Sequence, residues 1–514
     1  MNRVVGLIVA VACSGIGCGD NPPPPPDPTP PPPPALTEAE LVGKLSALPN
    51  VTVEQGQFPP GSVALAAEFR YYILHVTQPI DHHDPSRGTF VQRVQLLHRD
   101  ERAPNPMVVS AAGYTDLWGS SPVELTKMLT ANQVSIEHRY YGNSRPPTVD
   151  WSTLTIEQAA ADQHEIIAAL RTIYGGAFIT TGSSKGGMTA VFHRRFWPND
   201  VDGTVAYSAP LSWSASDEVY QDKLDALDVT PCRHAVRAAA TDMLVNHRDE
   251  LVAKASAEPN HVYGRVAIGP AVEGAISDFE WSYWTYHGLA DCEKVPAAGA
   301  TVDELYAFLE KVSSVTEYDD ENVAAYEPYV YQSHTELGYP SEEPSYFEEP
   351  ALLMFTDADF AGELPAAPDG DDHGGGNRGP GSGNSHGSDD HGSDDPAPRV
   401  QVTFDPQVML DVDDFVEHHS ARMMFVYGGG DPWSARPFLI GRSADSAMFI
   451  QPDGTHQVQI GSLPARDRNE AFDMLERWTG VAPVVPRGRP IAPLHEEVPR
   501  ALSPARAHNP RVAK

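Results

Sequence analysis

Between residues 106 and 207, short runs of apolar residues alternate with longer stretches of helical periodicity. Buried strands are predicted for the apolar runs at residues 106–110, 134–138, 177–181 and 203–207. Thr155 and Gln158 have the spacing of a capping box, which opens a predicted helix to about residue 174. A second helix follows the third run and extends to about residue 196. This alternation predicts a mostly parallel sheet with helices on both faces.

The pattern differs on both sides of this region. Apolar and β-branched runs at residues 69–76 and 89–97 flank a turn-like stretch and predict a β-hairpin. Before them, residues 35–60 carry apolar side chains at helical spacing, and we expect a helical lead-in there. After the alternating region, residues 211–420 contain long helical stretches and no clear strand–helix–strand pattern. We therefore expect an α/β sheet domain interrupted by an inserted, mainly helical cap domain.

The sheet pattern returns late in the chain. Strands are predicted at residues 422–427 and 447–450, and a last helix is predicted at 467–479. Within the cap, residues 365–398 are rich in Gly, Asp, Ser and His and should be disordered because they cannot bury a core. The expected layout is a first sheet part at 36–210, a cap at 211–420 containing the insert at 365–398, a second sheet part at 421–480 and a loose tail at 481–514.

The N-terminus carries the features of an export signal. A positive charge precedes an apolar run that is too short to span a bilayer, which predicts a signal peptide over residues 1–18. The proline-rich residues 19–35 should form a stiff, extended linker. We favour Cys18 as the lipidated cysteine of a bacterial cell-envelope lipoprotein, because the linker follows it almost at once. The alternative is plain secretion.

The net charge limits the classes of partner that we expect, and the cysteines indicate one disulfide. The 514 residues carry a formal net charge of −34, which argues against nucleic acid and against an anionic membrane surface as partners. A membrane contact is then expected only through the N-terminal lipid. Outside the leader the cysteines are Cys232 and Cys292, which in an exported chain most simply form one disulfide. The alternative is two buried free thiols, and the oligomeric state is not indicated.

The strongest chemical motif follows the third predicted strand. Residues 182–186 have the sequence GSSKG, which matches the pattern G-x-S-x-G. A serine on a tight strand-to-helix turn has strained backbone angles, and small residues two positions away on either side let the chain fold back without a clash. The apolar strand before the motif and the helix after it are the context that this turn requires. The sequence therefore predicts the α/β-hydrolase fold with Ser184 as nucleophile.

Such a serine needs a base and an acid that orients the base, and both should follow the ends of late strands. Asp431 follows the first returning strand through a run of three glycines, and His456 follows the second. We predict that Ser184, His456 and Asp431 form a catalytic triad. Asp453 is the second choice for the acid, but it lies three residues before the histidine and more simply shapes the loop.

Two backbone N–H groups are expected to form the oxyanion hole. One is the N–H of Lys185, directly after the nucleophile, and the other is the N–H of Tyr114, in the loop after the first buried strand. Gly113 would allow the backbone of that loop to approach the substrate.

Short motifs distributed over residues 66–480 form a wider set. They are QPIDH at 78–82, GTF at 88–90, EHRYYG at 137–142, GSSKGGMT at 182–189, FWPNDVDG at 196–203 and YGGGDPW at 427–433. The set resembles the bacterial secreted prolyl tripeptidyl and tetrapeptidyl aminopeptidases, and more distantly the prolyl carboxypeptidase and dipeptidyl peptidase family. Lys185 favours the aminopeptidases, because the second family usually has tyrosine after the nucleophile.

The resemblance implies a function and further site residues. It implies that a serine exopeptidase with a helical cap releases short peptides, tri- or tetrapeptides, from free N-termini, often with proline at the cleaved bond, and that the triad is the one predicted above. Glu280, in an aromatic segment that only approximates the cap motif of the relatives, is a candidate partner for the substrate's amino group. Its alternative is a structural ion pair. Trp433 and Tyr114 are candidates for the walls of a proline pocket, with core packing as the alternative.

Other functions are less well supported by the sequence. An esterase or lipase could use the same triad, but the cap is polar and acidic, unlike the apolar lid of a lipase. A non-catalytic binding lipoprotein would leave the three catalytic residues unexplained. His82 and His83, and three histidines in the insert, lie near aspartates, but solvated loops explain them more simply than a metal does. We expect neither a metal nor an organic cofactor.

Overall fold

The computed structural model describes residues 34–116, 119–227, 230–341, 354–355, 357–366 and 399–485. The predicted leader, the lipidation at Cys18, nearly all of the linker and of the insert at 365–398, and the tail beyond residue 485 lie outside these residues.

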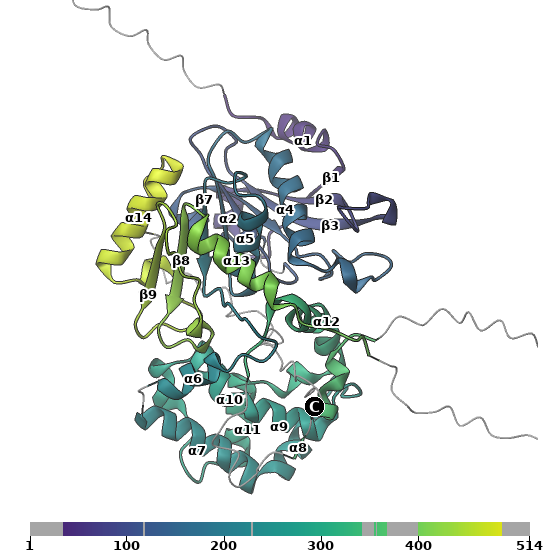
Figure 1. The fold of residues 1–514 in the computed structure, drawn as a ribbon, viewed down its shortest axis with the longest axis vertical. Helices are drawn as coiled ribbons and strands as arrows, with labels where there is room; N and C mark the ends of the chain where they lie inside the picture. The colour runs from purple at the N-terminus through teal and green to yellow at the C-terminus, as the bar shows by residue number, and fades with distance from the viewer. Residues whose placement is uncertain are drawn as a thin grey trace, which may run out of the picture. The chain divides into compact units, whose positions relative to one another are not determined.

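One sheet of nine strands organises the described chain (Figure 1). Its order is β1 (Val51–Gln55), β2 (Arg70–Pro79), β3 (Thr89–His98), β5 (Asn132–Ile136), β4 (Met107–Ala111), β6 (Phe178–Ser183), β7 (Gly203–Tyr207), β8 (Met423–Gly428) and β9 (Ala447–Gln451). The strands β1, β2, β3 and β5 pair antiparallel with one another, and every pair from β5 to β9 is parallel. This is the sheet of the α/β-hydrolase fold, and each strand predicted from an apolar run is present within a few residues.

The expected helical lead-in is only half right. Thr37 caps a helix, α1 (Glu38–Ser46), whose Leu41 and Leu45 are buried. The next residues instead form the edge strand β1, in which Val51 pairs with Val76 of β2. The reason is local: the helix ends before Asn50, which has a positive φ of 60°, and β-branched residues follow it.

Alternating side chains on the central strands divide the helices between the two faces of the sheet. Val109 of β4 packs in one apolar cluster with α1 and α4 (Ile156–Arg171), whereas Val108 packs in another with α3 (Glu124–Met128) and α14 (Ala465–Thr479). On β7, Val205 shares the cluster of α14, and Ala206 shares that of α5 (Lys185–Phe196). The sheet is therefore covered by helices on both faces. Strand β6 lies in the middle of the strand order, and α5 covers one face of the sheet.

The cap consists of helices inserted between β7 and β8. They are α6 (Val219–Ala226), α7 (Thr230–Asn246), α8 (Arg248–Ala257), α9 (Ile268–Ser277), α10 (Phe279–Tyr286), α11 (Val302–Val312) and α12 (Asp320–Gln332), which a π-helical turn at Ser333–Leu337 extends. In Figure 1 they lie below the sheet domain. None of the described helices is both long and apolar enough to cross a membrane.

The C-terminal end of the predicted cap contacts the sheet domain. Residues 406–418 form a further helix, α13 (Pro406–His418), which packs against α5 of the sheet domain. Arg195 of α5 contacts Asp411 of α13 with an N–O distance of 2.8 Å. The amphipathic pattern of α13 suits either domain, and its buried residues, among them Val412 and Val416, pack into the cluster that contains α5. Helix α13 also contacts the π-helical turn at Ser333–Leu337, so it touches both the cap and the sheet domain, and residue 420 stays the predicted end of the cap.

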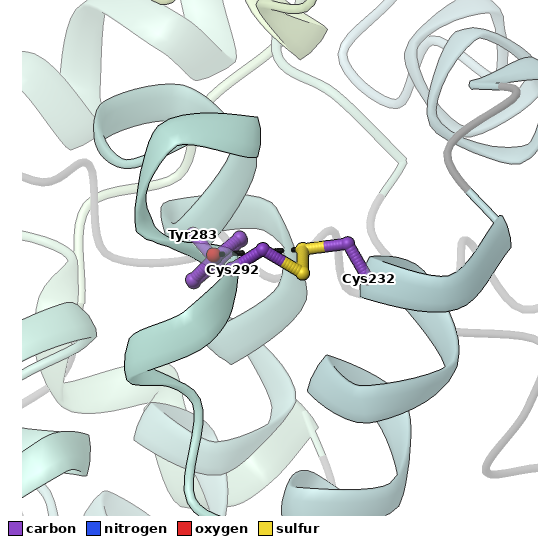
Figure 2. Close-up of a disulfide and its surroundings, with 3 residues drawn as sticks. All are labelled: Cys232, Tyr283 and Cys292. Carbon is purple, nitrogen blue, oxygen red and sulfur yellow. Dashed lines mark hydrogen bonds between the residues drawn. A yellow bond between two sulfur atoms is a disulfide. The ribbon is translucent and has the colours of Figure 1, made fainter.

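Cys232 and Cys292 form a disulfide in the cap (Figure 2). Their Cα atoms are 5.5 Å apart, an ordinary separation for a disulfide. Cys232 belongs to α7, and Cys292 belongs to a short 3-10 helix (Leu289–Lys294) that follows α10. The hydroxyl of Tyr283 on α10 lies 3.7 Å from the Cys232 sulfur. The bond therefore joins α7 to the segment that follows α10.

Candidate active site

Ser184 occupies a tight turn between β6 and α5. Its backbone has φ 55° and ψ −130°, a region that costs a residue other than glycine conformational energy. Small neighbours are required there: a Cβ on Gly182 would lie 2.2 Å from the carbonyl oxygen of Gly186, and one on Gly186 would lie 2.5 Å from that of Ala111. The turn has the geometry predicted from the GSSKG motif and places Ser184 at the carboxyl end of the sheet.

His456 and Asp431 come from the loops after β9 and β8. The His456 Nδ1 is 2.8 Å from Asp431 Oδ2, and both side chains are buried. Asp431 also accepts hydrogen bonds from the Trp433 N–H and the Ser434 hydroxyl, each at 3.1 Å. A carboxylate on Nδ1 favours the tautomer with a proton there, so that Nε2 is the ring nitrogen that can accept a proton. Asp453, the second choice, is exposed.

One pocket brings most of the predicted residues together. Its lining includes Ser184, His456, Gly113, Tyr114 and Trp433, and Asp431 lies behind the histidine. Residues from β4, β6 and the loops after β8 and β9 thus meet at one end of the sheet, as expected for parallel strands whose carboxyl ends share an edge.

The cap contacts the histidine directly. The backbone N–H of His456 donates a hydrogen bond to the carbonyl oxygen of Thr285 on α10 at 2.9 Å. The ring of Tyr286, the next residue, lies edge-on to the imidazole with a centroid distance of 6.1 Å and lines the same pocket. Tyr286 was not singled out from the sequence, although it ends the aromatic segment in which Glu280 was noticed. The cap is therefore part of the site.

Glu124 is a second residue that the sequence did not reveal. Its carboxylate accepts from the Tyr207 hydroxyl at 2.8 Å and from the N–H groups of Ile460 and Gly461 at 3.0 and 2.8 Å. Burial raises the pKa of Glu124, while these hydrogen bonds oppose the rise. Glu124 thereby ties the segment that follows His456 to β7. A lone glutamate on a short helix gives no signal of this role.

The two expected oxyanion donors lie against each other. A Cβ on Gly113 would lie 2.6 Å from the Gly186 nitrogen, so the loop after β4 packs directly on the turn of the nucleophile. In the part of the chain that the structure describes, neither the Tyr114 N–H nor the Lys185 N–H donates to a protein acceptor. The Lys185 N–H also lies in the first turn of α5, where the helix dipole favours negative charge. Both groups are thus available to a developing oxyanion.

Glu280 differs from the expectation. Its two carboxylate oxygens accept hydrogen bonds from Arg233 Nε at 2.9 Å and Arg237 Nε at 2.8 Å, and the side chain is buried. It does not line the pocket that contains Ser184. The structure therefore shows Glu280 in a buried ion pair with two guanidinium groups, the alternative stated above.

The two histidines of the predicted hairpin turn, His82 and His83, each contact one carboxylate of the sheet domain. His82 Nε2 lies 2.7 Å from Asp162, and His83 lies 3.4 Å from Glu157. Among the described residues, no group of three or more His, Cys, Asp or Glu side chains is placed to bind a metal ion. The histidines of the insert lie outside the described residues.

Comparison with known proteins gives a family and a relative that spans most of the chain. Residues 63–352 and 394–501 match the model of PS-10 peptidase S37. The chain is 36% identical over 446 residues to the prolyl tri/tetrapeptidyl aminopeptidase of Streptomyces mobaraensis, covering 84% of this chain and 86% of the relative. It is 31% identical over 178 residues to the human lysosomal Pro-X carboxypeptidase, covering 31% and 36% of the two chains. Among solved structures, the proline iminopeptidase of Mycobacterium smegmatis matches with 11% identity and a TM-score of 0.34 over 79% of this chain and 98% of that one, a likeness too weak to bear on function.

Proposed function

This chain belongs to the peptidase S37 family and is a serine peptidase, and we propose that it releases tri- or tetrapeptides from the free N-termini of peptides, with a preference for proline at the cleaved bond. The observation that carries the proposal is the pocket in which Ser184 and His456 meet beneath the cap residue Tyr286. The Streptomyces relative, similar over most of both chains, supports the choice of substrate.

The arrangement supports a two-step acyl transfer. As Ser184 Oγ bonds to the carbonyl carbon of the substrate, His456 Nε2 takes the hydroxyl proton, and Asp431 holds the resulting imidazolium through Nδ1. The N–H groups of Lys185 and Tyr114 stabilise the oxyanion. The carbon–nitrogen bond then breaks, and the proton passes from His456 to the leaving amine. Water repeats the sequence on the acyl-enzyme and releases the short peptide.

The cap supports cleavage near a chain end. The backbone of Thr285 and the ring of Tyr286 connect α10 to the catalytic histidine, so the cap covers one side of the pocket. A covered pocket admits a chain terminus more readily than the middle of a folded protein. We propose that a residue other than Glu280 binds the substrate's amino group, because the charge of Glu280 is paired with Arg233 and Arg237.

Aromatic side chains suit a proline ring. Trp433 and Tyr114 both line the pocket. Trp433 also packs edge-on against Trp281 at a centroid distance of 5.2 Å, so packing and substrate contact are combined in one side chain. Flat, apolar walls of this kind favour the rigid pyrrolidine ring over charged side chains.

Export is part of the proposal. We propose that residues 1–18 direct secretion and that Cys18 anchors the mature protein by a lipid, with plain secretion as the alternative. The disulfide between Cys232 and Cys292 suits an oxidising compartment outside the cytoplasm. A peptidase held at the cell surface would act on peptides from the surroundings.

The test is a set of reporter substrates. The full exported protein would be incubated with Ala-Ala-Pro and Ala-Pro reporter amides, with the same peptides N-acetylated, and with a short-chain ester, alongside a Ser184→Ala variant. Cleavage of the free Ala-Ala-Pro amide that is lost on acetylation and in Ser184→Ala is expected. Turnover of the ester alone would indicate an esterase, and inactivity on all substrates would favour a binding protein.

A further inference from the structure

The side chain of Lys185 turns inward directly after the nucleophile. It is 3% exposed, and its ammonium donates to the carbonyl oxygen of Gly113 at 2.6 Å. Nζ also lies over the rings of Tyr114 and Tyr141, at 5.4 and 5.1 Å from their centroids. A buried ammonium is costly unless it is paired, and these contacts are the compensation that the structure provides. Lys185 is therefore buried beside the nucleophile and does not extend into solvent.

The carbonyl that Lys185 holds belongs to the same peptide group as the Tyr114 N–H. In a planar trans peptide the C=O and the N–H point in opposite directions. An ammonium bound to the Gly113 oxygen therefore turns the Tyr114 N–H away from Nζ. Since this N–H donates to no acceptor among the described residues, it is available to a substrate atom.

The peptide between Gly113 and Tyr114 lies in a tightly packed loop. A Cβ on Gly113 would lie 2.7 Å from the carbonyl carbon of Lys185, so the absence of a side chain lets the two backbones touch. The same absence permits Gly113 a wide range of backbone angles. The contact with Lys185 and the hydrogen bond from the His138 backbone N–H to the Tyr114 carbonyl oxygen, at 3.2 Å, limit that range on either side of the peptide. The charge-assisted hydrogen bond to the Gly113 carbonyl acts on the peptide itself, and it polarises the peptide so that its N–H becomes a stronger donor.

We propose that the Lys185 ammonium is a positioning group, which orients the Gly113–Tyr114 peptide so that the Tyr114 N–H faces the oxyanion of the tetrahedral intermediate. The inference rests on the proposed function only in requiring that Ser184 attacks a carbonyl carbon. It concerns the side chain of Lys185, whereas the oxyanion hole itself uses the backbone N–H of that residue.

The charge of Lys185 depends on its surroundings. Burial lowers the pKa of Lys185 to about 7, and the charge of Glu336, in the π-helical turn of the cap, acts in the opposite direction. His138 faces the same ammonium, and its pKa is held well below the ordinary value by burial and then by the charge of Lys185. The other groups facing Nζ are the phenols of Tyr114 and Tyr141.

The experiment compares Lys185→Met with Thr180→Val. Methionine retains most of the volume but cannot donate to the Gly113 carbonyl. Thr180→Val is the matched control, because it removes a buried hydrogen bond, that to the Thr204 hydroxyl at 2.9 Å, from the strand that leads to the nucleophile without touching the oxyanion loop. Both variants would be measured on the Ala-Ala-Pro amide and on a p-nitrophenyl ester. Inhibition by an Ala-Ala-Pro aldehyde and by the product Ala-Ala-Pro would be measured in parallel.

Loss of one oxyanion donor typically lowers kcat by about 100- to 1000-fold. A donor that is present but poorly oriented should cost less, and we expect Lys185→Met to lower kcat about 10- to 100-fold with little change in KM. The aldehyde forms a tetrahedral adduct and should lose affinity by a similar factor, whereas the product should not. Thr180→Val should change none of these values by more than about twofold.

Two outcomes would overturn the inference. One is a Lys185→Met enzyme whose kcat stays within about twofold of the wild type. The other is a loss confined to KM and product affinity, with aldehyde binding unchanged, which would make Lys185 a wall of the substrate pocket. Failure of the proposed substrate class is a separate result: the wild type would then ignore the amide, while the ester would still report on the oxyanion hole of both enzymes.

Discussion

Replacing Glu280 with glutamine removes the negative charge that lies between two guanidinium groups in the cap. Glu280 bonds to Arg233 and Arg237, and both arginines also contact the carboxylate of Asp225, at 2.8 and 3.1 Å. Glutamine has the same shape, so the change removes charge without leaving a cavity. Its amide oxygen can accept from one arginine, but its NH₂ group must face the other.

The cost follows from the two hydrogen bonds. A hydrogen bond to a charged group contributes about 1.5–3 kcal/mol, and breaking a fully buried ion pair costs about 3–5 kcal/mol. The Arg237 side chain is 23% exposed and the Asp225 carboxylate remains, so solvent and a second anion reduce the penalty. We therefore expect Glu280→Gln to lower the free energy of unfolding by about 2–3 kcal/mol.

The assay pairs unfolding with inhibition. Urea unfolding would give the stability of Glu280→Gln and of Glu293→Gln, a control that makes the same charge change at an exposed cap residue. Inhibition of the folded enzymes by Ala-Ala-Pro and by its N-acetylated form would report on recognition of the amino group. We expect the preference for the free amino group to be unchanged in both variants. An unaltered stability of Glu280→Gln, together with a tenfold loss of affinity for the free peptide alone, would refute the ion-pair interpretation.

Three further changes test other parts of the structure. Asp431→Asn should lower kcat by about three to four orders of magnitude with KM nearly unchanged, because the amide no longer holds His456 in the correct tautomer; steady-state kinetics check this. Burial raises the pKa of Glu336 from 4.5 to about 7. Between these two pH values the carboxyl group is protonated in the folded state and ionised in the unfolded state, so the free energy of unfolding falls as the pH rises through this window. Urea unfolding should therefore show that the stability of Glu336→Gln relative to the wild type increases as the pH rises from 5 to 8. Reduction of the disulfide between Cys232 and Cys292, 60 residues apart, should cost up to about 4 kcal/mol of stability, because the unfolded chain regains the conformational entropy that the closed loop had removed. The fall in Tm on adding reductant checks this, and the Cys232→Ser/Cys292→Ser double variant should show no such fall.

The sheet was predictable because most of its strands are buried on both faces. Every residue of β5, β7 and β8 is buried, and β8 is an almost continuous apolar run, which differs clearly from the amphipathic helices. The edge strand β1 was missed for the opposite reason: one side is open, its burial is partial, and the leucines of α1 made the whole segment look helical. Helix α13 shows a different limit of the sequence: an amphipathic pattern shows that a helix has a buried face but not which domain covers it.

The site divides in the same way. The turn at Ser184 and the loops that carry Asp431 and His456 are local structures, in which glycines and strand ends set the backbone within a few residues. The side chain of Glu280 depends instead on Arg233, 47 residues away, and the same carboxylate would suit a substrate ammonium equally well. Periodicity and spacing carry no information about which cation occupies it.

Lys185 combines both cases. Its position after the nucleophile was noticed only as a mark of resemblance, since the more distant relatives usually have tyrosine there. A buried lysine needs an acceptor and aromatic surface, and both come from loops that lie far from it in the sequence, Gly113 being 72 residues away. A lysine at this position therefore requires compatible residues in two other loops. The contacts of Lys185 with Gly113 and Tyr141 give that requirement a physical form, which the motif alone could not supply.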